Sequence, residues 1–204
     1  MNTLTNIIKY KVIAPVYDAV IGNQLFRKAR SRAFALLQLQ SCQNVLLVGV
    51  GTGEDILLLP EDINIVGVDI SEAMLEKARE KAMGRPKVLL NMNAEKMELD
   101  DEAFDAIVLN LILSVVENPQ RAMSEAVRVL KENGRILVFD KFLADGEKPS
   151  LARKLLNTVT SLIGTDINRR FGEIIKGLPV QIVHDEPSIF AGSYRIILLQ
   201  KMLK

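Results

Sequence analysis

The stretch VLLVGVGTG, at residues 45–53, places three glycines directly behind an apolar run. Gly49, Gly51 and Gly53 alternate with other residues, and glycine lets a backbone turn sharply and approach a ligand closely. A loop that leads into a helix also points free N–H groups outward, which suits an anionic group. The spacing therefore predicts a loop that holds a carboxylate or a phosphate at the start of the following helix.

Asp69 ends the second apolar run, which in a doubly wound sheet lies beside the glycine loop. A carboxylate there can accept both hydroxyls of a ribose, so loop and acid together indicate a nucleoside cofactor with an anionic tail. A dinucleotide site requires G-x-G-x-x-G, but the sixth residue counted from Gly49 is Glu54, which disfavours an NAD-dependent reductase. The observed G-x-G-x-G suits S-adenosylmethionine, whose tail is a small amino acid. A glycine-rich turn without a ligand is the remaining alternative. It is disfavoured because the loop, the acid and the strand order all indicate the same kind of site.

Strand-like and helix-like segments alternate through the middle of the chain, which is typical of a parallel α/β sheet. Ser71 and Asn118 are good N-cap residues for two of the helices. The strands are predicted at residues 45–48, 63–68, 87–90, 104–109 and 135–139, and the helices at 52–59, between Ser71 and Gly84, and from Pro119 to the sequence KENG.

Further elements are predicted at both ends of the chain. An amphipathic helix is expected over residues 25–37, and two more helices between residues 150 and 177. Two strand-like runs, at residues 180–183 and 194–199, finish the chain with only a glycine-containing loop between them. These runs must pair antiparallel, because a parallel pair would need a crossover connection.

Composition excludes several classes of protein. The 204 residues suffice for one domain with a sizeable core, and the net charge of +1 argues against a nucleic-acid partner held by bulk charge. No segment reaches the roughly 20 apolar residues of a membrane span, and the N-terminal residues lack a secretory pattern. We therefore expect one cytoplasmic domain over residues 1–204.

Cysteine and histidine occur once each, as Cys42 and His184. A single cysteine and a single histidine exclude an internal disulfide and a Cys/His zinc site within one chain, and no metal is expected. A Ser-His-Asp or Cys-His enzyme would depend on His184 alone, which is expected at a solvated strand end. These absences favour a reaction that relies on a cofactor.

Four stretches, taken in order, resemble the motifs of class I S-adenosylmethionine-dependent methyltransferases. They are VLLVGVGTG, NIVGVDISEAMLEKAR, NAEKMELDDEAFDAIVLN and RAMSEAVRVLKENGRILVFDK. The nearest likeness is to the group of ubiquinone- and menaquinone-biosynthesis enzymes and bacterial phosphatidylethanolamine N-methyltransferases. It covers residues 10–142 and the terminal hairpin, and each motif is weak alone but specific in this order and spacing.

The resemblance implies an α/β fold of the Rossmann-like type. The fold would be a three-layer sandwich, with helices on both faces of a seven-stranded, mostly parallel sheet whose last strand is antiparallel. Extra N-terminal helices at residues 1–40 would form a cap. A helical lid at residues 143–178 would lie between the fifth and sixth strands and close the substrate pocket together with the cap.

The resemblance also implies roles toward S-adenosylmethionine. The three glycines of the loop would wrap its methionine part, Asp69 would bind the ribose, and Ile70 would lie against the adenine. Asn93 and Ala94 occupy the place where the family contacts the adenine edge. Asn110 would lie beside the methionine part and the reacting methyl group. Tyr17, in VYDAVIG, matches a tyrosine–aspartate pair that the group carries near the cofactor.

Two positions depart from the family pattern. Leu47 stands where the motif usually has Glu or Asp, an acid that helps to orient the methionine end of the cofactor. Glu54 and Asp55 are nearby acids that could take its place. Asn93 replaces a usual Asp, but its amide oxygen can still accept from the adenine amino group.

Methyl transfer from a sulfonium is an in-line displacement, for which the protein supplies mainly positioning and desolvation. Candidate substrate residues are few, and each has an equal or stronger structural interpretation. Arg169 and Arg170 on the expected lid, together with basic residues of the helix at 25–37 (Arg27, Lys28, Arg30 and Arg32), could form a rim for an anionic substrate or for lipid headgroups. The other candidates are Tyr10, Ser114 and Asp140.

The leading hypothesis is a methyltransferase that acts on a small-molecule or lipid acceptor. A narrower alternative is a phospholipid amine N-methyltransferase with peripheral contact to a membrane surface. The basic helices and the resemblance to the phosphatidylethanolamine N-methyltransferase group favour this alternative. A third is a non-catalytic protein that binds S-adenosylmethionine, for which Leu47 is the only hint. The sequence identifies neither the acceptor atom nor the oligomeric state.

Overall fold

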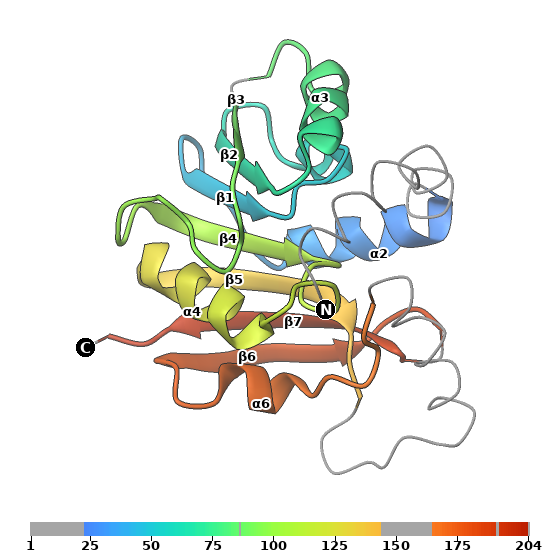
Figure 1. The fold of residues 1–204 in the computed structure, drawn as a ribbon, viewed down its shortest axis with the longest axis vertical. Helices are drawn as coiled ribbons and strands as arrows, with labels where there is room; N and C mark the ends of the chain where they lie inside the picture. The colour runs from blue at the N-terminus through green and yellow to red at the C-terminus, as the bar shows by residue number, and fades with distance from the viewer. Residues whose placement is uncertain (1–22, 86, 144–164, 191, 204) are drawn as a thin grey trace.

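A seven-stranded sheet runs through the centre of the protein (Figure 1). The computed structural model describes residues 23–85, 87–143, 165–190 and 192–203. The strands lie side by side in the order β3-β2-β1-β4-β5-β7-β6. Their bounds are β1 (Asn44–Val48), β2 (Asn64–Asp69), β3 (Lys87–Asn91), β4 (Phe104–Asn110), β5 (Leu130–Lys141), β6 (Val180–Pro187) and β7 (Tyr194–Lys201).

The direction of each strand follows the sequence prediction. Strands β1 to β5 pair in parallel, whereas β7 runs antiparallel to both of its neighbours, β5 and β6. The short connection between β6 and β7 enforces this arrangement, because a parallel pair needs a crossover. The predicted α/β fold, with a mostly parallel sheet and an antiparallel last strand, is confirmed.

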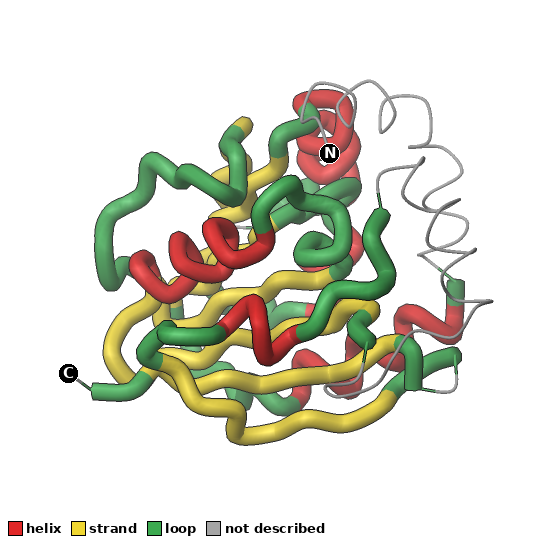
Figure 2. Tube along the Cα trace, turned by 60° about the horizontal axis from the view of Figure 1, so that its bottom comes forward, coloured by secondary structure: helices red, strands yellow, loops and turns green. Residues whose placement is uncertain are grey.

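Helices cover both faces of the sheet, with the strands between them (Figure 2). Successive side chains of β1 point to opposite faces, so Leu46 packs in one core cluster and Leu47 in the other. The face of Leu46 is covered by α4 (Pro119–Val129) and α6 (Phe171–Ile175). The face of Leu47 is covered by α2 (Gln24–Ala35), the 3-10 helix η1 (Glu54–Leu58) and α3 (Glu72–Lys81).

Helix α4 begins where the sequence predicts. Asn118 Oδ1 accepts a hydrogen bond from Arg121 N at 2.9 Å, and Pro119 takes the first helical position. Helix α2 begins in the same way, after Asn23, whose side chain accepts from two backbone N–H groups. These caps set the ends of the helices that flank the carboxyl edge of the sheet.

Three local features differ in detail from the sequence prediction. The helix expected at residues 52–59 is the short 3-10 segment η1, which begins after Gly53 at a left-handed φ of 86° and ends before Pro60. The strand expected at residues 135–139 is longer, because β5 follows α4 directly at Leu130. Ser71 stands at the N-cap of α3, but its side chain makes no capping hydrogen bond.

Some predictions fall outside the described residues. Tyr10 and Tyr17 belong to residues 1–22, and the first helix expected after residue 150 belongs to residues 144–164. The described part of the expected lid is residue 143 and residues 165–178, and the latter contain α6 on the face of α4. Within the part of the chain that the structure describes, none of the helices has the length and apolar character needed to cross a membrane.

Candidate functional site

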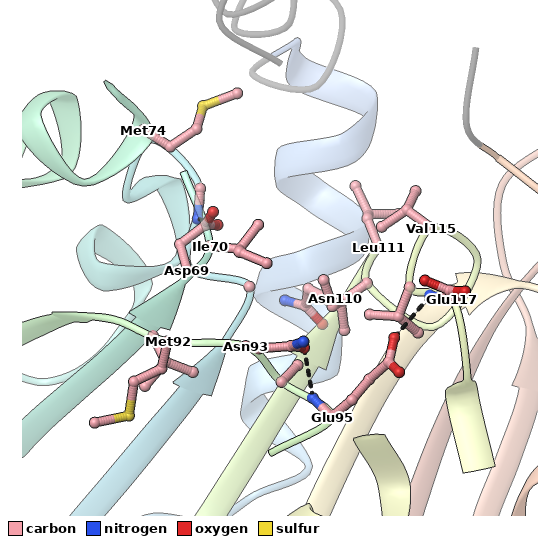
Figure 3. Close-up of a pocket in the computed structure, with 16 residues that line it drawn as sticks. Asp69, Ile70, Met74, Met92, Asn93, Glu95, Asn110, Leu111, Val115 and Glu117 are labelled. Atoms are coloured by element: carbon pink, nitrogen blue, oxygen red, sulfur yellow. Dashed lines mark hydrogen bonds between the residues drawn. The ribbon is translucent and has the colours of Figure 1, made fainter. Parts of the chain in front are cut away.

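A pocket opens at the carboxyl edge of the sheet, where β1, β2, β3 and β4 end beside one another (Figure 3). The strand order reverses between β1 and β4, and ligands of open α/β sheets bind at such a switch point. The pocket holds about 790 Å³ of empty space, its open mouth included.

Seven of the nine predicted cofactor residues line this pocket: Gly49, Gly51, Asp69, Ile70, Asn93, Ala94 and Asn110. Asp69 and Ile70 lie on one side of it, with Asn110 near its centre (Figure 3). Tyr17 belongs to the residues that are not described, and Gly53 is placed elsewhere.

Gly49 and Gly51 are held in conformations that favour glycine, with φ of +72° and +55°. A Cβ at Gly49 would lie 2.7 Å from Ile112 Cδ1, so this glycine also lets the loop after β4 pack closely. A Cβ at Gly51 would meet no atom nearer than 4.0 Å, so the space beside it is open. The two glycines therefore shape a loop whose backbone borders the pocket.

Gly53 has a different place from the one expected. Its φ is +86°, and a Cβ there would lie 3.0 Å from Ala78 Cα of helix α3. Gly53 therefore allows α3 to approach the end of the loop, and it is not among the residues that line the pocket. The predicted contact of Gly53 with the cofactor stays a prediction.

Asp69 connects the glycine loop to the end of β2. Its Oδ2 accepts from Gly51 N at 2.9 Å, and its Oδ1 accepts from Ser71 N at 2.9 Å. Burial raises the pKa of this carboxyl, and the backbone hydrogen bonds oppose that shift. An ionised carboxylate has about four acceptor sites, so capacity remains for the hydroxyls of a ribose.

Asn93 and Glu95 form a turn at the far end of the pocket (Figure 3). Asn93 Oδ1 accepts from Glu95 N at 2.9 Å, so one lone pair of this amide oxygen is occupied and one stays available. Glu95 Oε1 in turn accepts from Glu117 N at 2.8 Å and Asn118 N at 3.0 Å. Glu95 thereby fastens the turn after β3 to the start of α4.

The loop after β4 forms an apolar wall on the opposite side, made of Leu111, Ile112, Val115 and Val116. Leu111 takes a left-handed φ of 58°, which is unusual for a branched residue and marks a constrained site. Its N–H donates to Phe139 O at 2.8 Å, which ties the wall to β5. We call these four residues the apolar wall.

Sequence reasoning missed this wall and several other lining residues. The remaining ones are Val68, Met74, Met92, Glu95 and Glu117. The signal that could have found most of them is their position immediately after the predicted ends of β3 and β4.

Ser114 and Asp140, both predicted to face a substrate, are fully buried and do not line the pocket. Asp140 Oδ2 accepts from Ser114 N at 2.9 Å, and Asp140 Oδ1 accepts from Lys141 N at 2.7 Å. Burial raises the pKa of the Asp140 carboxyl. The two residues hold the loop after β4 against the end of β5, and their contact with a substrate stays a prediction.

Arg169 also supports the apolar wall from behind. Its guanidinium donates to Val116 O at 2.7 Å and to Leu113 O, and it pairs with Asp166, whose own N–H donates to Ser114 O. Neither Arg169 nor Arg170 lines the pocket. The described contacts therefore do not place the two arginines at an anionic substrate.

The basic rim expected from the helix at residues 25–37 is also altered. Arg30 is only 4% exposed and pairs with Asp55, while Arg32 pairs with Glu186 at 2.7 Å. Arg27 and Lys28 remain exposed on α2. Two of the four basic residues are therefore exposed and form no ion pair with the described residues, whereas Arg30 belongs to the interior.

A smaller hollow adjoins the pocket on the side of α2 and η1. It shares Gly49, Gly51, Asn110 and Leu111 with the pocket and adds Arg30, Val50, Thr52, Glu54 and Asp55. Asp55 Oδ2 accepts from Asn110 Nδ2 at 2.8 Å, and Asp55 Oδ1 lies 3.3 Å from Arg30 Nη1. Helix α2 passes behind Asn110 in Figure 3, which is how Arg30 reaches this hollow.

Leu47 and His184, which the sequence analysis also singled out, both lie outside the pocket. Leu47 is 1% exposed in the core cluster on the α2 face. His184 lies on the edge strand β6, with Nε2 3.2 Å from Glu186 Oε2, and is not a pocket residue. Across the described ranges, no group of three or more His, Cys, Asp and Glu side chains is arranged to hold a metal ion.

Comparison with known proteins agrees with this geometry. Residues 46–138 match the family model described as a methyltransferase domain. The chain is 30% identical over 190 residues to a phosphatidylethanolamine N-methyltransferase of Cereibacter sphaeroides, an alignment that covers 91% of this chain and 93% of the relative. It is 34% identical over 121 residues to a demethylmenaquinone methyltransferase of Clavibacter sepedonicus. That alignment covers 58% of this chain and 48% of the relative, so the chain matches about half of that protein's length.

A solved structure gives the same architecture. The geranyl diphosphate C-methyltransferase of Streptomyces coelicolor A3(2), determined in complex with S-adenosyl-L-homocysteine, superposes with a TM-score of 0.75. The superposition covers 91% of this chain and 81% of that chain at 16% sequence identity, which shows a shared fold.

Proposed function

This chain belongs to the S-adenosylmethionine-dependent methyltransferases, and from that premise we propose that its methyl acceptor is an amphiphilic amine of the phospholipid kind. The single observation that carries this proposal is the apolar wall of the pocket, Leu111, Ile112, Val115 and Val116. An acceptor with an apolar portion would bury that portion against the wall, and burial of apolar surface is favourable.

The described pocket fits the cofactor S-adenosylmethionine. The open space beside Gly51 leaves room for a ligand, and Asp69 keeps acceptor capacity for a ribose. The buried Asn110 Oδ1 has no hydrogen-bond partner among the described residues, so a donor from a ligand would satisfy it. When bound, the cofactor supplies a methyl group that is already activated for in-line displacement.

The residues of the chain then contribute mainly position and desolvation. Within the described part of the pocket, the titratable groups are Asp69, Glu95 and Glu117. Asp69 lies on the ribose side, and Glu95 is engaged by two backbone N–H groups. A neutral amine attacks through its own lone pair and needs no base for the attack, so an amine acceptor suits this set better than a hydroxyl or a carbon nucleophile.

The similarity to the Cereibacter sphaeroides protein supports the same class of acceptor, because the alignment spans nearly the whole of both chains. The similarity to demethylmenaquinone methyltransferase keeps a quinone as the second candidate. A quinone is also an amphiphile that an apolar wall accommodates, but its reacting carbon calls for a base.

Transfer of radiolabelled methyl groups would identify the acceptor class. The assay would offer phosphatidylethanolamine in mixed micelles, a demethylated quinol in the same micelles, and soluble ethanolamine. We expect label in the phosphatidylethanolamine and little in ethanolamine, which lacks the apolar portion. Label in the quinol alone would replace the proposed acceptor with the second candidate, and label in ethanolamine alone would contradict the role of the apolar wall.

We also propose contact with a membrane surface through the start of α2 and the loop between β6 and β7. Leu25 and Phe190 are 48% and 57% exposed, and both adjoin Phe26, whose ring lies 6.0 Å from that of Phe190. Arg27 and Lys28 are exposed on the same helix as Leu25. Apolar side chains next to basic ones favour binding to anionic lipid headgroups.

Sedimentation with vesicles would test this contact. Vesicles with anionic lipid should bind the protein at low salt and release most of it at high salt, because exposed charges are screened. The variant Phe190→Ser should bind less, whereas Met83→Ser, at an exposed methionine on the loop after α3, should bind as the unchanged protein does. Equal binding of all three proteins would contradict the proposed surface.

A further inference from the structure

Asp55 is a buried carboxylate that the adenine and ribose side of the pocket does not use. It lies in the smaller hollow, 2.8 Å from Asn110 Nδ2 and 3.3 Å from Arg30 Nη1. The residue is 8% exposed, and its segment η1 directly follows the glycine loop. A buried acid is costly unless it is paired, and Asp55 is paired with Arg30 and Asn110.

Asn110 gives a second and independent sign of a ligand. It is 7% exposed, and it lines both the pocket and the smaller hollow. Its Nδ2 donates to Asp55, but its Oδ1 has no hydrogen-bond partner in the described structure. The buried carbonyl oxygen and the carboxylate are both acceptors at one junction, and such a pair fits a ligand with a positively charged donor.

Leu47 lies on the face of β1 that α2 and η1 cover. Leu47 occupies the position of the family's usual acid, yet it is buried in the core cluster that also contains Ala29 of α2 and Ile56 of η1. Those two residues are the chain neighbours of Arg30 and Asp55. The face of β1 that would carry an acid is therefore covered by α2 and η1, the elements that carry Arg30 and Asp55.

We propose that Asp55 replaces the acid missing at Leu47 and, together with Asn110 Oδ1, binds the α-ammonium group of the methionine part of S-adenosylmethionine. Arg30 positions Asp55 from α2 through their ion pair. The inference rests on family membership and on the cofactor, and it is independent of which acceptor is methylated.

The charges around Asp55 support this assignment. Burial raises the pKa of the Asp55 carboxyl, and Arg30 and Asn110 oppose that rise, while Glu54 on the same segment adds to it. An ammonium beside the carboxylate would favour its ionised form. Because the pKa is raised, a fall in pH should protonate Asp55, and weaken this contact, at a higher pH than an ordinary aspartate would.

Two ligands distinguish binding of the amino acid portion of the cofactor from binding of its nucleoside portion. S-adenosylhomocysteine carries the amino acid portion, whereas 5′-methylthioadenosine has the same nucleoside without it. Isothermal titration of both ligands would be carried out on the unchanged protein, on Asp55→Asn, and on Asp62→Asn as a control at an exposed aspartate. Asp55→Asn should weaken S-adenosylhomocysteine by roughly ten- to a hundredfold, the loss of one charged hydrogen bond.

The same variant should change the affinity for 5′-methylthioadenosine by less than about twofold, and Asp62→Asn should change neither affinity. Equal weakening of both ligands would overturn the proposal, because Asp55 would then only shape the loop. Unchanged binding of S-adenosylhomocysteine would also overturn it. Failure of the unchanged protein to bind either ligand would instead contradict the cofactor assignment.

Glu54→Gln tests the other nearby acid. Its carboxylate is paired with Lys81 of α3, so we expect an unchanged preference for S-adenosylhomocysteine over 5′-methylthioadenosine. If this variant loses that preference and Asp55→Asn keeps it, the acid is Glu54 and the proposal is wrong.

A measurement on the unchanged protein covers the case in which Asp55→Asn does not fold. Affinities for the two ligands would be compared from pH 7.5 downward. S-adenosylhomocysteine should lose affinity faster than 5′-methylthioadenosine, which reports on Asp69 and the rest of the nucleoside site. Parallel curves for the two ligands would overturn the proposal.

Discussion

Gly51 shows how one residue can serve both the fold and the ligand. Its φ of +55° excludes most side chains, and its N–H donates to Asp69 Oδ2 at 2.9 Å. Because the space beside its Cα is open, the glycine loop is shaped here by backbone conformation and not by crowding. A substitution of Gly51 should therefore change the affinity for the ligand as well as the unfolding free energy.

Gly51→Ala and Gly84→Ala form a matched pair. Both glycines have positive φ, of +55° and +82°, and neither has an atom nearer than 4.0 Å to the added Cβ. Each variant should lose about 1–2 kcal/mol of unfolding free energy from the left-handed conformation. Only Gly51→Ala should weaken S-adenosylhomocysteine, as measured by titration, because Gly84 lies outside the pocket. Equal ligand affinity of the two variants would contradict the assigned role of Gly51.

Leu111 also has a left-handed backbone conformation, which is strained for a residue with a side chain. At its φ of 58°, a Cβ is strained and a glycine is not. Both Leu111→Ala and Leu111→Gly remove the side chain, yet we expect the glycine variant to be more stable by about 1 kcal/mol. Urea unfolding would measure the difference. The reverse order, which is usual at ordinary backbone positions, would show that the loop relaxes out of this conformation.

At the scale of elements, the loop after β4 depends on contacts from distant parts of the chain. Asp140 at the end of β5 accepts from Ser114 N, and Arg169 donates to Leu113 O and Val116 O. The sequence prediction placed these three polar residues at a substrate. The structure shows that they position the apolar wall, which forms one side of the pocket.

Arg169→Lys should loosen that wall. A lysine cannot reproduce the two directed bonds of a guanidinium, so the unfolding free energy should fall by about 1–2 kcal/mol. Amide hydrogen exchange over residues 111–118 should become faster. Arg170→Lys is the control, because Arg170 pairs with the exposed Glu173 at 3.7 Å. Equal exchange in the two variants would show that Arg169 does not hold the loop.

At the scale of the whole molecule, three aspartates with raised pKa values surround the carboxyl edge of the sheet. Asp55, Asp69 and Asp140 share one main cause, which is desolvation by burial. A carboxyl whose folded pKa exceeds its unfolded value binds more protons in the folded state between the two values. Its contribution to stability is therefore full below the unfolded pKa and is lost as the pH rises through the folded pKa.

Asp140→Asn isolates one of these contributions. The variant loses an acceptor for a backbone N–H group, but it also loses the buried charge. The unfolding free energy of the original protein should therefore exceed that of the variant most at low pH, and this difference should shrink as the pH rises. Urea unfolding of both proteins from pH 4.5 to 7.5 would measure it. Asp105 and Glu125, whose pKa values are lowered, behave in the opposite sense, but they are the same in both proteins and cancel in the difference. A difference that grows with pH would contradict the prediction.

The sequence by itself determined the order of the elements, the glycine loop, Asp69 and Asn110, and the antiparallel last strand. These features depend on local patterns: apolar runs that end in polar residues, glycines at fixed spacing, and a connection too short for a crossover. The family resemblance drawn from these patterns is confirmed by the comparisons.

Only the tertiary structure decided which polar residues face the pocket and which are buried. Asp140 follows a predicted strand in the same manner as Asn110, but it accepts from Ser114 N, 26 residues away, and Arg169 donates to Val116 O, 53 residues away. Arg30 and Asp55 are 25 residues apart, and their pairing on the face of Leu47 depends on how α2 crosses the sheet. Burial and long-range pairing are properties of packing, and no local pattern encodes them.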